Sequence, residues 1–493
     1  MKKIIIYCIL FTSVAFSACN DWLSLSPEDS QTTTGYWQTK EQVEAVLGGG
    51  YSQLRGCLDE ILNWGEARGN SLTVGQFATN DLSRMNRWDI VPTNSICSWA
   101  GFYKVINQAN MIIKYAPSVV DKDPSFNQGL MKSYMAEAYY LRALSYFYLV
   151  RNFKEVPLIL DPYLSDDHSY EVAKSSESEI FDQIKRDLDT ALVSTKEVFD
   201  QTWESKGRAT KWAVYTTLAD VYLWTGEYDK CIDACEAVMN SGRVGLIRGM
   251  VGTVNNWYTI FNPGNSNESI FELQFNYNLG QSNSLVTWFS TSNIFAISPY
   301  MVQLFESSVE DIRGSGVSYS GIYSWKYVGI SANSVTPRTD YPNWVIYRMA
   351  DIYLMEAEAY ILKTPELDNN QNNINYAKAI DLVNTIRSRA NISIPLSGTN
   401  DEPGMLSIVM DERAREFFSE GKRWYDLLRV ARLHNYQYKD YLIDQVLQSA
   451  SAMYSPVIKA TLMNTDSYYL PISDSELKLN HKLVQNPYYQ NIK

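Results

Sequence analysis

The sequence predicts a mainly α fold, in which about four helix pairs pack against an irregular, loop-rich half with minor β structure. Three observations predict it. Apolar residues recur at helical spacing through most of residues 39–242. One helix-pair pattern occurs twice. Residues 243–342 then turn to Gly, Ser, Asn and aromatic residues, a composition typical of irregular structure.

The chain opens with a secretory signal pattern. Met1, Lys2 and Lys3 give a positive start, and residues 4–15 form an apolar run of about a dozen residues. A membrane-spanning helix needs roughly 20 apolar residues, so this run is too short to cross a bilayer. We therefore expect residues 1–18 to be a cleaved signal peptide.

Cys19 follows directly on this signal. The segment Phe16-Ser17-Ala18-Cys19 resembles the lipobox of bacterial lipoproteins, although Phe16 stands where Leu is usual. An ordinary signal peptide with a coincidental Cys is the alternative. Because Cys19 follows a complete signal, we expect it to be lipidated. Several acyl chains anchor a protein stably, and the polar residues 19–38 would then act as a leash.

Composition narrows the class of protein. The net charge is -12 and no cluster of Lys and Arg is present, which argues against a nucleic-acid partner. Aromatic residues make up 13%, with 35 Tyr and 13 Trp, and such side chains suit sugars, peptides and protein interfaces alike. Cys231 and Cys235 lie one helical turn apart without a nearby His, so we expect core residues rather than zinc ligands and predict no cofactor.

Helical signals run through the amino-terminal half. Apolar spacing predicts a helix over residues 41–47 that can continue past three glycines, and a second over 99–115 that pairs with it. A stretch without Gly or Pro predicts a helix over 133–150. The run Ser175-Ser176-Glu177-Ser178-Glu179 carries a capping signature that opens another helix, reaching to about residue 192.

The clearest unit is residues 208–240. Ala219, Tyr222, Gly226 and Tyr228 stand at the small and aromatic positions of a tetratricopeptide helix pair. A second copy begins at Ala357, with its extra residues expected in an Asn-rich loop over 368–375. The four tetratricopeptide-like pairs, at 41–115, 133–192, 210–240 and 343–389, should stack as a short superhelix; unrelated amphipathic helices are the alternative.

The rest of the chain is less regular. Within 243–342 we expect a strand at 269–275 and a helix at 299–306. A long irregular insertion in a compact fold is usually functional. The predicted organisation is 1–18 signal, 19–38 leash, 39–242 helical with a loop insertion at 63–99, 243–342 ligand-binding insertion, 343–390 last helix pair and 391–493 closing helices and loops.

Several ordered motifs resemble one family. In chain order they are Trp22-Leu23 with Pro27, Trp99 with Tyr103, Ile106, Ala109 and Asn110, Arg142-Ala143 to Leu158, Tyr347 to Ala359, Asp411 to Arg429, and Leu470-Pro471-Ile472 with Asn486-Pro487. They resemble the SusD/RagB family of outer-membrane nutrient-binding lipoproteins of Bacteroidetes. Ser473 and Tyr488 depart from the family pattern. Asp411 and Glu412 each stand within one turn of Arg415, and we interpret this alternating charge as a structural, exposed or paired face.

The resemblance carries implications. It implies an outer-membrane, lipid-anchored protein that faces the cell exterior and closes a TonB-dependent, SusC-like transporter as a lid. It also implies glycan ligands on a Trp and Tyr platform with amide and Arg donors. Sugar chemistry agrees, because pyranose rings stack on aromatic rings while their hydroxyl groups form hydrogen bonds.

Two loops contain aromatic, amide and Arg side chains of this kind. The predicted ligand-binding residues of the first loop are Trp64, Asp81, Arg84, Asn86, Arg87 and Trp88; those of the second loop are Tyr277, Trp288, Phe289, Tyr300 and Trp325. We favour Trp88, Trp288 and Trp325 most. Their neighbours in the sequence are polar, so packing in the core accounts for these three residues less well.

The leading function is capture of oligosaccharides and their delivery to the transporter. Capture of peptides or glycoprotein fragments uses the same residue types and stays open. A glycoside hydrolase would need two positioned carboxylates, which are too plentiful here to be informative, and no catalytic motif stands out, so we expect no enzyme. A pure helical scaffold is the third alternative.

Overall fold

The computed structural model describes residues 33–164, 170–290, 292–363 and 369–491. The predicted signal, Cys19 and most of the leash lie outside these ranges. The described chain is mainly α, as predicted. Over those ranges, no helix combines the length and apolarity that crossing a membrane requires.

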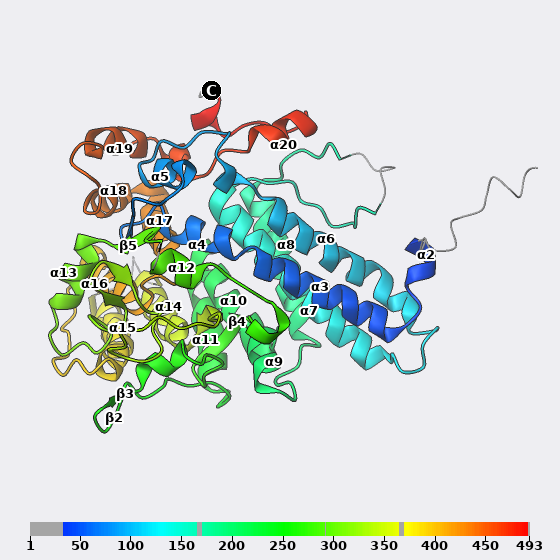
Figure 1. Ribbon diagram of the computed structural model, residues 1–493, viewed down its shortest axis with the longest axis horizontal. Helices are drawn as coiled ribbons and strands as arrows, with labels where there is room; N and C mark the ends of the chain where they lie inside the picture. Colours follow the sequence, from blue (N-terminus) through cyan, green and yellow to red (C-terminus); the bar gives the residue numbers. More distant parts are fainter. Residues whose placement is uncertain (1–32, 165–169, 291, 364–368, 492–493) are drawn as a thin grey trace, which may run out of the picture.

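The amino-terminal half forms a layer of long antiparallel helices (Figure 1). After the short α2 (Thr33–Tyr36), α3 (Lys40–Gly56) packs on α6 (Ala100–Tyr115), and α6 packs on α7 (Gln128–Phe153) and α7 on α8 (Glu177–Leu192). The predicted pairing of the first two helices is confirmed. So is the capping box of α8, where Ser176 N–H donates to Glu179 Oε2 at 2.9 Å and Glu179 N–H donates to Ser176 Oγ at 3.3 Å.

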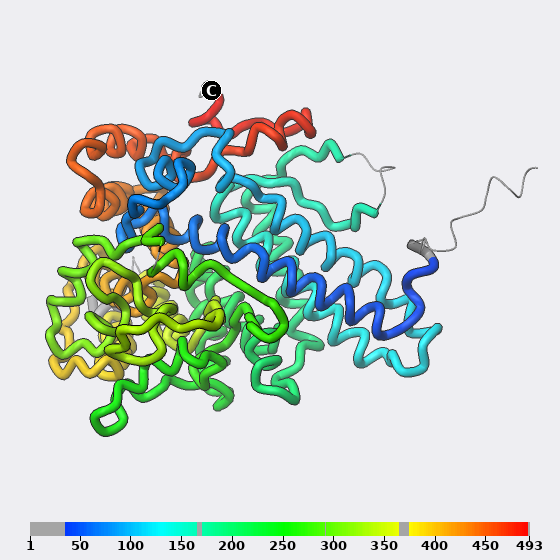
Figure 2. The backbone as a smooth tube through the Cα atoms, in the orientation of Figure 1, coloured from blue at the N-terminus to red at the C-terminus, as the bar shows by residue number. Residues whose placement is uncertain are grey.

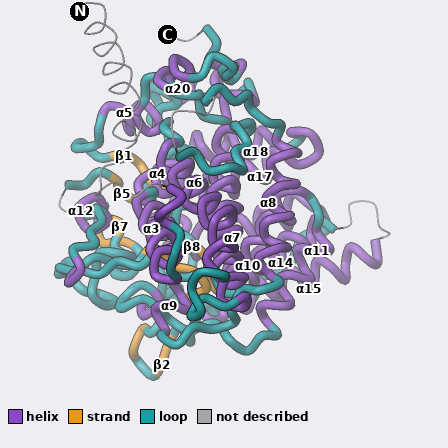
Figure 3. Tube along the Cα trace, turned by 90° about the vertical axis from the view of Figure 1, so that its right-hand side faces the viewer, coloured by secondary structure: helices purple, strands orange, loops and turns teal. Residues whose placement is uncertain are grey.

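The two repeat copies form the next layer. They comprise α10 (Lys211–Thr225) with α11 (Tyr228–Met239), and α14 (Met349–Leu362) with α15 (Asn369–Arg389). Contacts between α11 and α14 continue the stack, which Figure 3 shows from the side. The loop expected over 368–375 was wrong for its described part: α15 already begins at Asn369. An Asn-rich run without Gly or Pro contains no residue that breaks a helix.

The irregular half is held by short strands. One sheet has the order β1 (Leu72–Val74), β5 (Phe295–Ile297), β7 (Tyr323–Ser324) and β6 (Tyr319–Ser320), and a hairpin joins β2 (Met250–Val251) to β3 (Val254–Asn255). The predicted strand appears as β4 (Ser269–Leu273), which pairs with the buried β8 (Trp344–Arg348) that leads into α14. The predicted helix appears as α13 (Pro299–Glu306).

The remaining elements close the fold. They are α4 (Leu58–Glu66), α5 (Asn80–Asn86), α9 (Thr202–Gly207), α12 (Leu285–Phe289), α16 (Glu402–Glu416), α17 (Arg423–Tyr436), α18 (Lys439–Leu447), α19 (Ser455–Leu462) and α20 (Asp474–Leu479), with 3₁₀ turns at Ser95–Cys97, Ala116–Val119, Trp257–Ile260, Tyr277–Leu279, Thr465–Tyr468 and Pro487–Tyr489. Segments from opposite ends of the chain lie together, since α4 contacts α17 (Figure 2). One continuous core runs from Trp37 to Tyr489, so the predicted division into segments stays a prediction. Cys231 and Cys235 are buried, as predicted for core residues.

Most of the alternating charges of α16 are buried, so the prediction of an exposed face was wrong. Glu412 and Glu416 are fully buried and accept hydrogen bonds from Arg313, each at 2.7 Å. Arg415 pairs with Glu412 at 3.4 Å, as predicted, whereas Asp411 accepts from Tyr300 instead. The structural role is confirmed, because Arg313 lies in the irregular half and this network therefore fastens that half to the helices.

Candidate functional site

The two predicted ligand loops meet in the structure. Strand β1 from the first loop pairs with β5 from the second, with Thr73 opposite Ala296. The backbone N–H of Gly75 extends this contact by donating to Ile294 O at 2.9 Å. Residues that are far apart in the sequence therefore belong to one region of the surface.

Four of the predicted aromatic residues are core residues, which corrects the expected platform. Trp64 and Phe289 have no exposed surface, and Trp88 and Trp325 expose only 4% and 6%. Trp64 Nε1 donates to Ile96 O at 2.7 Å, and the Phe289 ring lies 6.0 Å from that of Phe295.

Trp88 and Trp325 had seemed poor core residues because their sequence neighbours are polar. Trp88 has a positive φ of 60° at the end of α5, and its ring lies 5.1 Å from the ring of Trp424. Trp325 packs under Gly329, where a Cβ atom would lie only 2.6 Å from the indole nitrogen. At Trp88 a turn directs the ring inward while Arg87 and Asp89 stay at or near the surface. At Trp325 the polar neighbours Ser324 and Lys326 are fully buried as well.

Two of the predicted polar residues are engaged locally. Asp81 Oδ2 accepts from Ser95 N–H at 2.9 Å and from Ser95 Oγ–H at 2.6 Å. Arg84 pairs with Asp89 at 3.0 Å. The first contacts join the start of α5 to the 3₁₀ turn at Ser95–Cys97, and the second holds the end of α5 to the residues that follow it. Local structure therefore explains both side chains.

Asn86 and Arg87 instead line a hollow. We call it the Arg87 hollow; its volume is about 310 Å³, and it lies between α5, β1, α18 and α19. The lining residues are Gly69, Thr73, Val74, Ser83, Asn86, Arg87, Val446, Ser449, Ala450, Ser451, Tyr454 and Ile458. A second hollow of about 440 Å³ adjoins it across Arg87 and Tyr454 and includes Trp88, Asp89 and Tyr488.

Arg87 is the uncommitted cation of this region. Its guanidinium carbon lies 5.2 Å from the centre of the Tyr454 ring, close enough for a cation–π contact. Within the described ranges it forms no ion pair, in contrast to Arg84. The side-chain amide nitrogen of Asn86 is engaged within the protein, because it donates to Ala67 O at 3.0 Å. Its amide oxygen accepts no hydrogen bond within those same ranges, which leaves an acceptor for a ligand hydroxyl.

The remaining predicted residues are dispersed. Tyr277 is 60% exposed and its ring lies 5.7 Å from that of Tyr341. Trp288 is half-buried, 6.1 Å from the ring of Phe295. Tyr300 is half-buried and donates to Asp411 at 3.3 Å, and burial raises the pKa of both groups. Of these three predicted residues, Tyr277 is the most exposed.

Sequence reasoning missed Tyr454 and the α18–α19 wall. Tyr454 lies in the helical and loop segment near the carboxyl end, where no motif marked it. Its importance comes only from Arg87, which is remote in sequence. No local sequence pattern could therefore have predicted the contact between Arg87 and Tyr454.

Comparisons with known proteins agree with the fold. The model of the SusD family matches residues 300–489, and the model described as starch-binding and associating with the outer membrane matches residues 21–223. The SusD-like protein P38 of Formosa agariphila is 23% identical over 87% of this chain and 92% of its own.

Solved structures show the same architecture. A SusD superfamily protein from Bacteroides vulgatus aligns with a TM-score of 0.74 and 21% identity, over 92% of this chain and 100% of that one. A laminarin-binding SusD-like protein aligns at 0.70, with 21% identity and the same coverage of both chains. The fold is shared from the first helices to the closing segment, and both ends match family models. The chain belongs to the SusD/RagB family.

Proposed function

We propose that this protein is a lipid-anchored, outward-facing glycan-binding protein of the outer membrane that captures oligosaccharides and delivers them to a TonB-dependent, SusC-like transporter. Family membership and the laminarin-binding relative support a carbohydrate ligand. The observation that carries the proposal is the stacking of an unpaired Arg87 on Tyr454 at the edge of an open hollow.

The hollow has the chemistry that sugars require. The Tyr454 ring offers an apolar face for the C–H groups of a pyranose, and Arg87 offers several N–H donors to its hydroxyl groups. Ser83 and Ser451 line the same space with hydroxyl groups that both donate and accept. These contacts suit both α-linked and β-linked sugars, so a binding screen is needed to identify the glycan.

Hydrolysis is not favoured at this site. A glycosidase needs a pair of carboxyl groups roughly 5 to 9.5 Å apart. The described lining of the Arg87 hollow contains neither Asp nor Glu. We therefore propose binding without catalysis, and a reducing-end assay on bound polysaccharide tests this directly.

The binding test uses the chain expressed from Asn20 and a panel of polysaccharides cast into native gels. Arg87→Ala and Tyr454→Ala should each strongly reduce the retardation that the unaltered chain shows on its glycan. Arg84→Ala is the matched control, because Arg84 lies in α5 three residues before Arg87 but pairs with Asp89. Equal retardation of Arg87→Ala and Arg84→Ala variants would reject the hollow as the site.

Two further experiments separate the alternatives. A peptide library captured by the unaltered chain but not by the Arg87→Ala variant would favour peptides as ligands. Purification from detergent-solubilised membranes should recover the protein together with an outer-membrane barrel. Recovery of the chain alone would contradict delivery to a transporter.

A further inference from the structure

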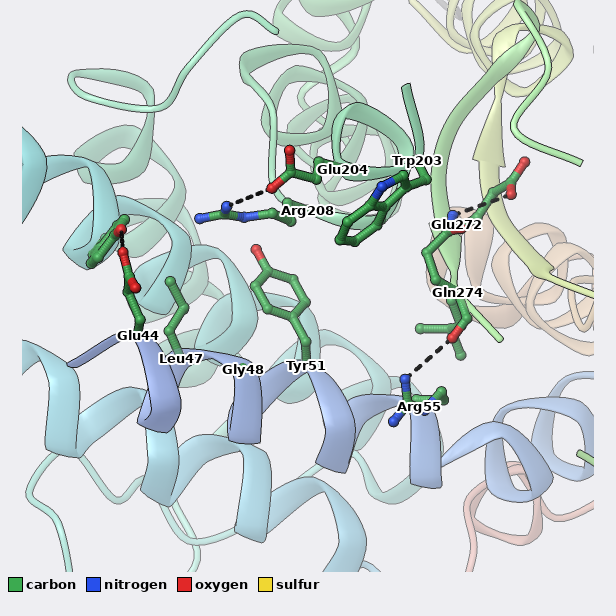
Figure 4. Close-up of a pocket in the computed structure, with 13 residues that line it drawn as sticks. Glu44, Leu47, Gly48, Tyr51, Arg55, Trp203, Glu204, Arg208, Glu272 and Gln274 are labelled. Carbon is green, nitrogen blue, oxygen red and sulfur yellow. Dashed lines mark hydrogen bonds and ion pairs between the residues drawn. The ribbon is translucent and has the colours of Figure 1, made fainter. Parts of the chain in front are cut away.

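Another pocket, shown in Figure 4, has no lining residue in either predicted loop. Its volume is about 430 Å³, and it is formed by one face of α3, the start of α7, helix α9 and strand β4. The labelled side chains of Tyr51, Arg55 and Trp203 surround the same space, with Arg208 at its upper edge. The Arg87 hollow shares none of these lining residues.

A glycine keeps the floor of this pocket open. Three consecutive glycines, Gly48, Gly49 and Gly50, lie within the continuous helix α3. Two of them face neighbouring helices: a Cβ on Gly50 would lie 3.1 Å from Leu141 Cδ1, and one on Gly49 would lie 3.7 Å from Gln108 Oε1. A Cβ on Gly48 would meet nothing within 4 Å. Glycine in a helix costs about 1 kcal/mol relative to alanine, and packing gives no reason for it at position 48. Gly48 lines the pocket instead.

The wall opposite α3 carries an exposed indole on a fixed element. Trp203 of α9 is 54% exposed. Helix α9 is tied to β4, because Lys206 Nζ donates to Ser269 O at 2.6 Å and because a Cβ on Gly207 would lie 2.4 Å from Gln274 Cγ. A large apolar ring that is exposed on a rigid support is a ready stacking surface.

Arg55 is the available donor in the pocket. It donates to Gln274 O at 3.3 Å and to Ser52 Oγ at 3.1 Å, and among the described residues it has no carboxylate partner. Arg208, by contrast, is paired with Glu137 at 2.6 Å and with Glu204 at 3.3 Å. Arg55 thus keeps N–H groups that a ligand can use.

The charge of the lining indicates a neutral ligand. Glu44 and Glu204 contribute two carboxylates against the two guanidinium groups of Arg55 and Arg208, while the lining residue Glu272 is fully buried. A ligand that brought a further carboxylate or sulfate would therefore meet no excess of positive charge. Hydroxyl groups fit better, because they accept from Arg55 and donate to Glu44 at the other end of the pocket.

We propose that this pocket, which we call the Gly48 pocket, is a second saccharide-binding site, in which a neutral pyranose stacks on Trp203 above the open floor at Gly48 and takes a hydrogen bond from Arg55. The proposal rests on the proposed function in one respect, that the ligands are glycans. The two sites are independent in their residues, so they can be tested separately.

The experiment monitors the Trp203 side chain directly by fluorine NMR. The chain is labelled with 5-fluorotryptophan, and the resonance that disappears in Trp203→Phe is assigned to Trp203. Maltotriose and laminaritriose are titrated separately, and we expect at least one to shift this resonance in both the unaltered chain and the Arg87→Ala variant. Trp203→Ala should weaken trisaccharide binding at this site by about tenfold, measured by calorimetry in the Arg87→Ala background.

Gly48→Leu is the blocking variant, because its side chain enters the pocket without meeting other atoms near Cβ. It should abolish the shift of the Trp203 resonance. Gly56→Leu is the matched control: it is the same change on the same helix, also into open space, but outside the pocket. We expect it to keep the shift.

The outcomes separate this inference from the proposed function. No shift of Trp203 with either trisaccharide, or a shift that persists in Gly48→Leu, would overturn the Gly48 pocket while leaving the Arg87 hollow intact. A larger response to trigalacturonic acid than to the neutral trisaccharides would overturn the neutral class. A shift of Trp203 together with unchanged gel retardation of Arg87→Ala would support the pocket and reject the hollow.

Discussion

Arg348 donates to both carboxylate oxygens of Glu420, from Nε at 3.0 Å and from Nη2 at 2.8 Å. Arg348 ends the buried strand β8, and Glu420 lies in the turn between α16 and α17. The same guanidinium reaches Glu268 at 2.8 Å, and all three side chains are fully buried. The contact therefore joins the irregular half, the repeat stack and the closing helices at one point.

Replacing Arg348 by Ala should strongly destabilise the fold. The substitution leaves Glu420 and Glu268 buried with fewer cationic partners, and breaking a buried ion pair typically costs 3–5 kcal/mol. Urea unfolding followed by circular dichroism measures this free energy. Arg84→Ala, which breaks the partly exposed pair with Asp89, should change it by about 1 kcal/mol or less. Equal effects of the two variants would contradict a structural role for the network.

The ionisation of Glu420 should contribute to the pH dependence of the stability of the fold. Burial by itself would raise its pKa, but Arg348 and Lys326 lower the pKa to about 2, below the ordinary 4.5. The unfolded chain then binds a proton before the folded chain does, so this contribution is complete above about pH 4.5 and is lost as the pH falls toward 2. Glu420→Gln should show a shallower loss of stability in that window. A slope identical to that of the unaltered chain would argue against the lowered pKa.

Trp88→Ala should weaken folding rather than act as a binding-site variant. The ring is 96% removed from solvent by packing that includes Trp424, and truncating a buried Trp typically costs 3–5 kcal/mol. Thermal unfolding should show a clear drop in melting temperature. Tyr277→Ala is the contrasting change, since Tyr277 is 60% exposed, and should leave the melting temperature almost unaltered. A stable Trp88→Ala variant with lost glycan binding would restore Trp88 to the site.

Cys19→Ala should release the protein from the membrane if the predicted lipidation is correct. Acyl chains supply the affinity for the bilayer, and a chain without them has no stable anchor. Fractionation of cells and incorporation of labelled palmitate measure the two properties. Membrane association that survives in the Cys19→Ala variant, with label still incorporated, would contradict the lipobox interpretation.

Local chemistry determined the helices, and for this reason they could be predicted from sequence. Apolar spacing and the absence of Gly and Pro placed the core of α7, and Ser176 with Glu179 marked the start of α8. The repeated pattern of small and aromatic residues placed α10, α11 and α14 in one stack. Each of these signals depends on residues within a few turns of one another.

The exposure of the predicted site residues was decided by the tertiary structure. Whether Trp88 faces solvent depends on Trp424, and the position of Arg87 at the edge of its hollow depends on the contact with Tyr454; both partners come from the far end of the chain. The Gly48 pocket likewise needs α3 and α9, which are separated by most of the helical half. Sequence alone therefore determined which helices form and which family they resemble. Long-range packing decided which polar and aromatic side chains remain free to bind, because burial depends on contacts with residues that are distant in the sequence.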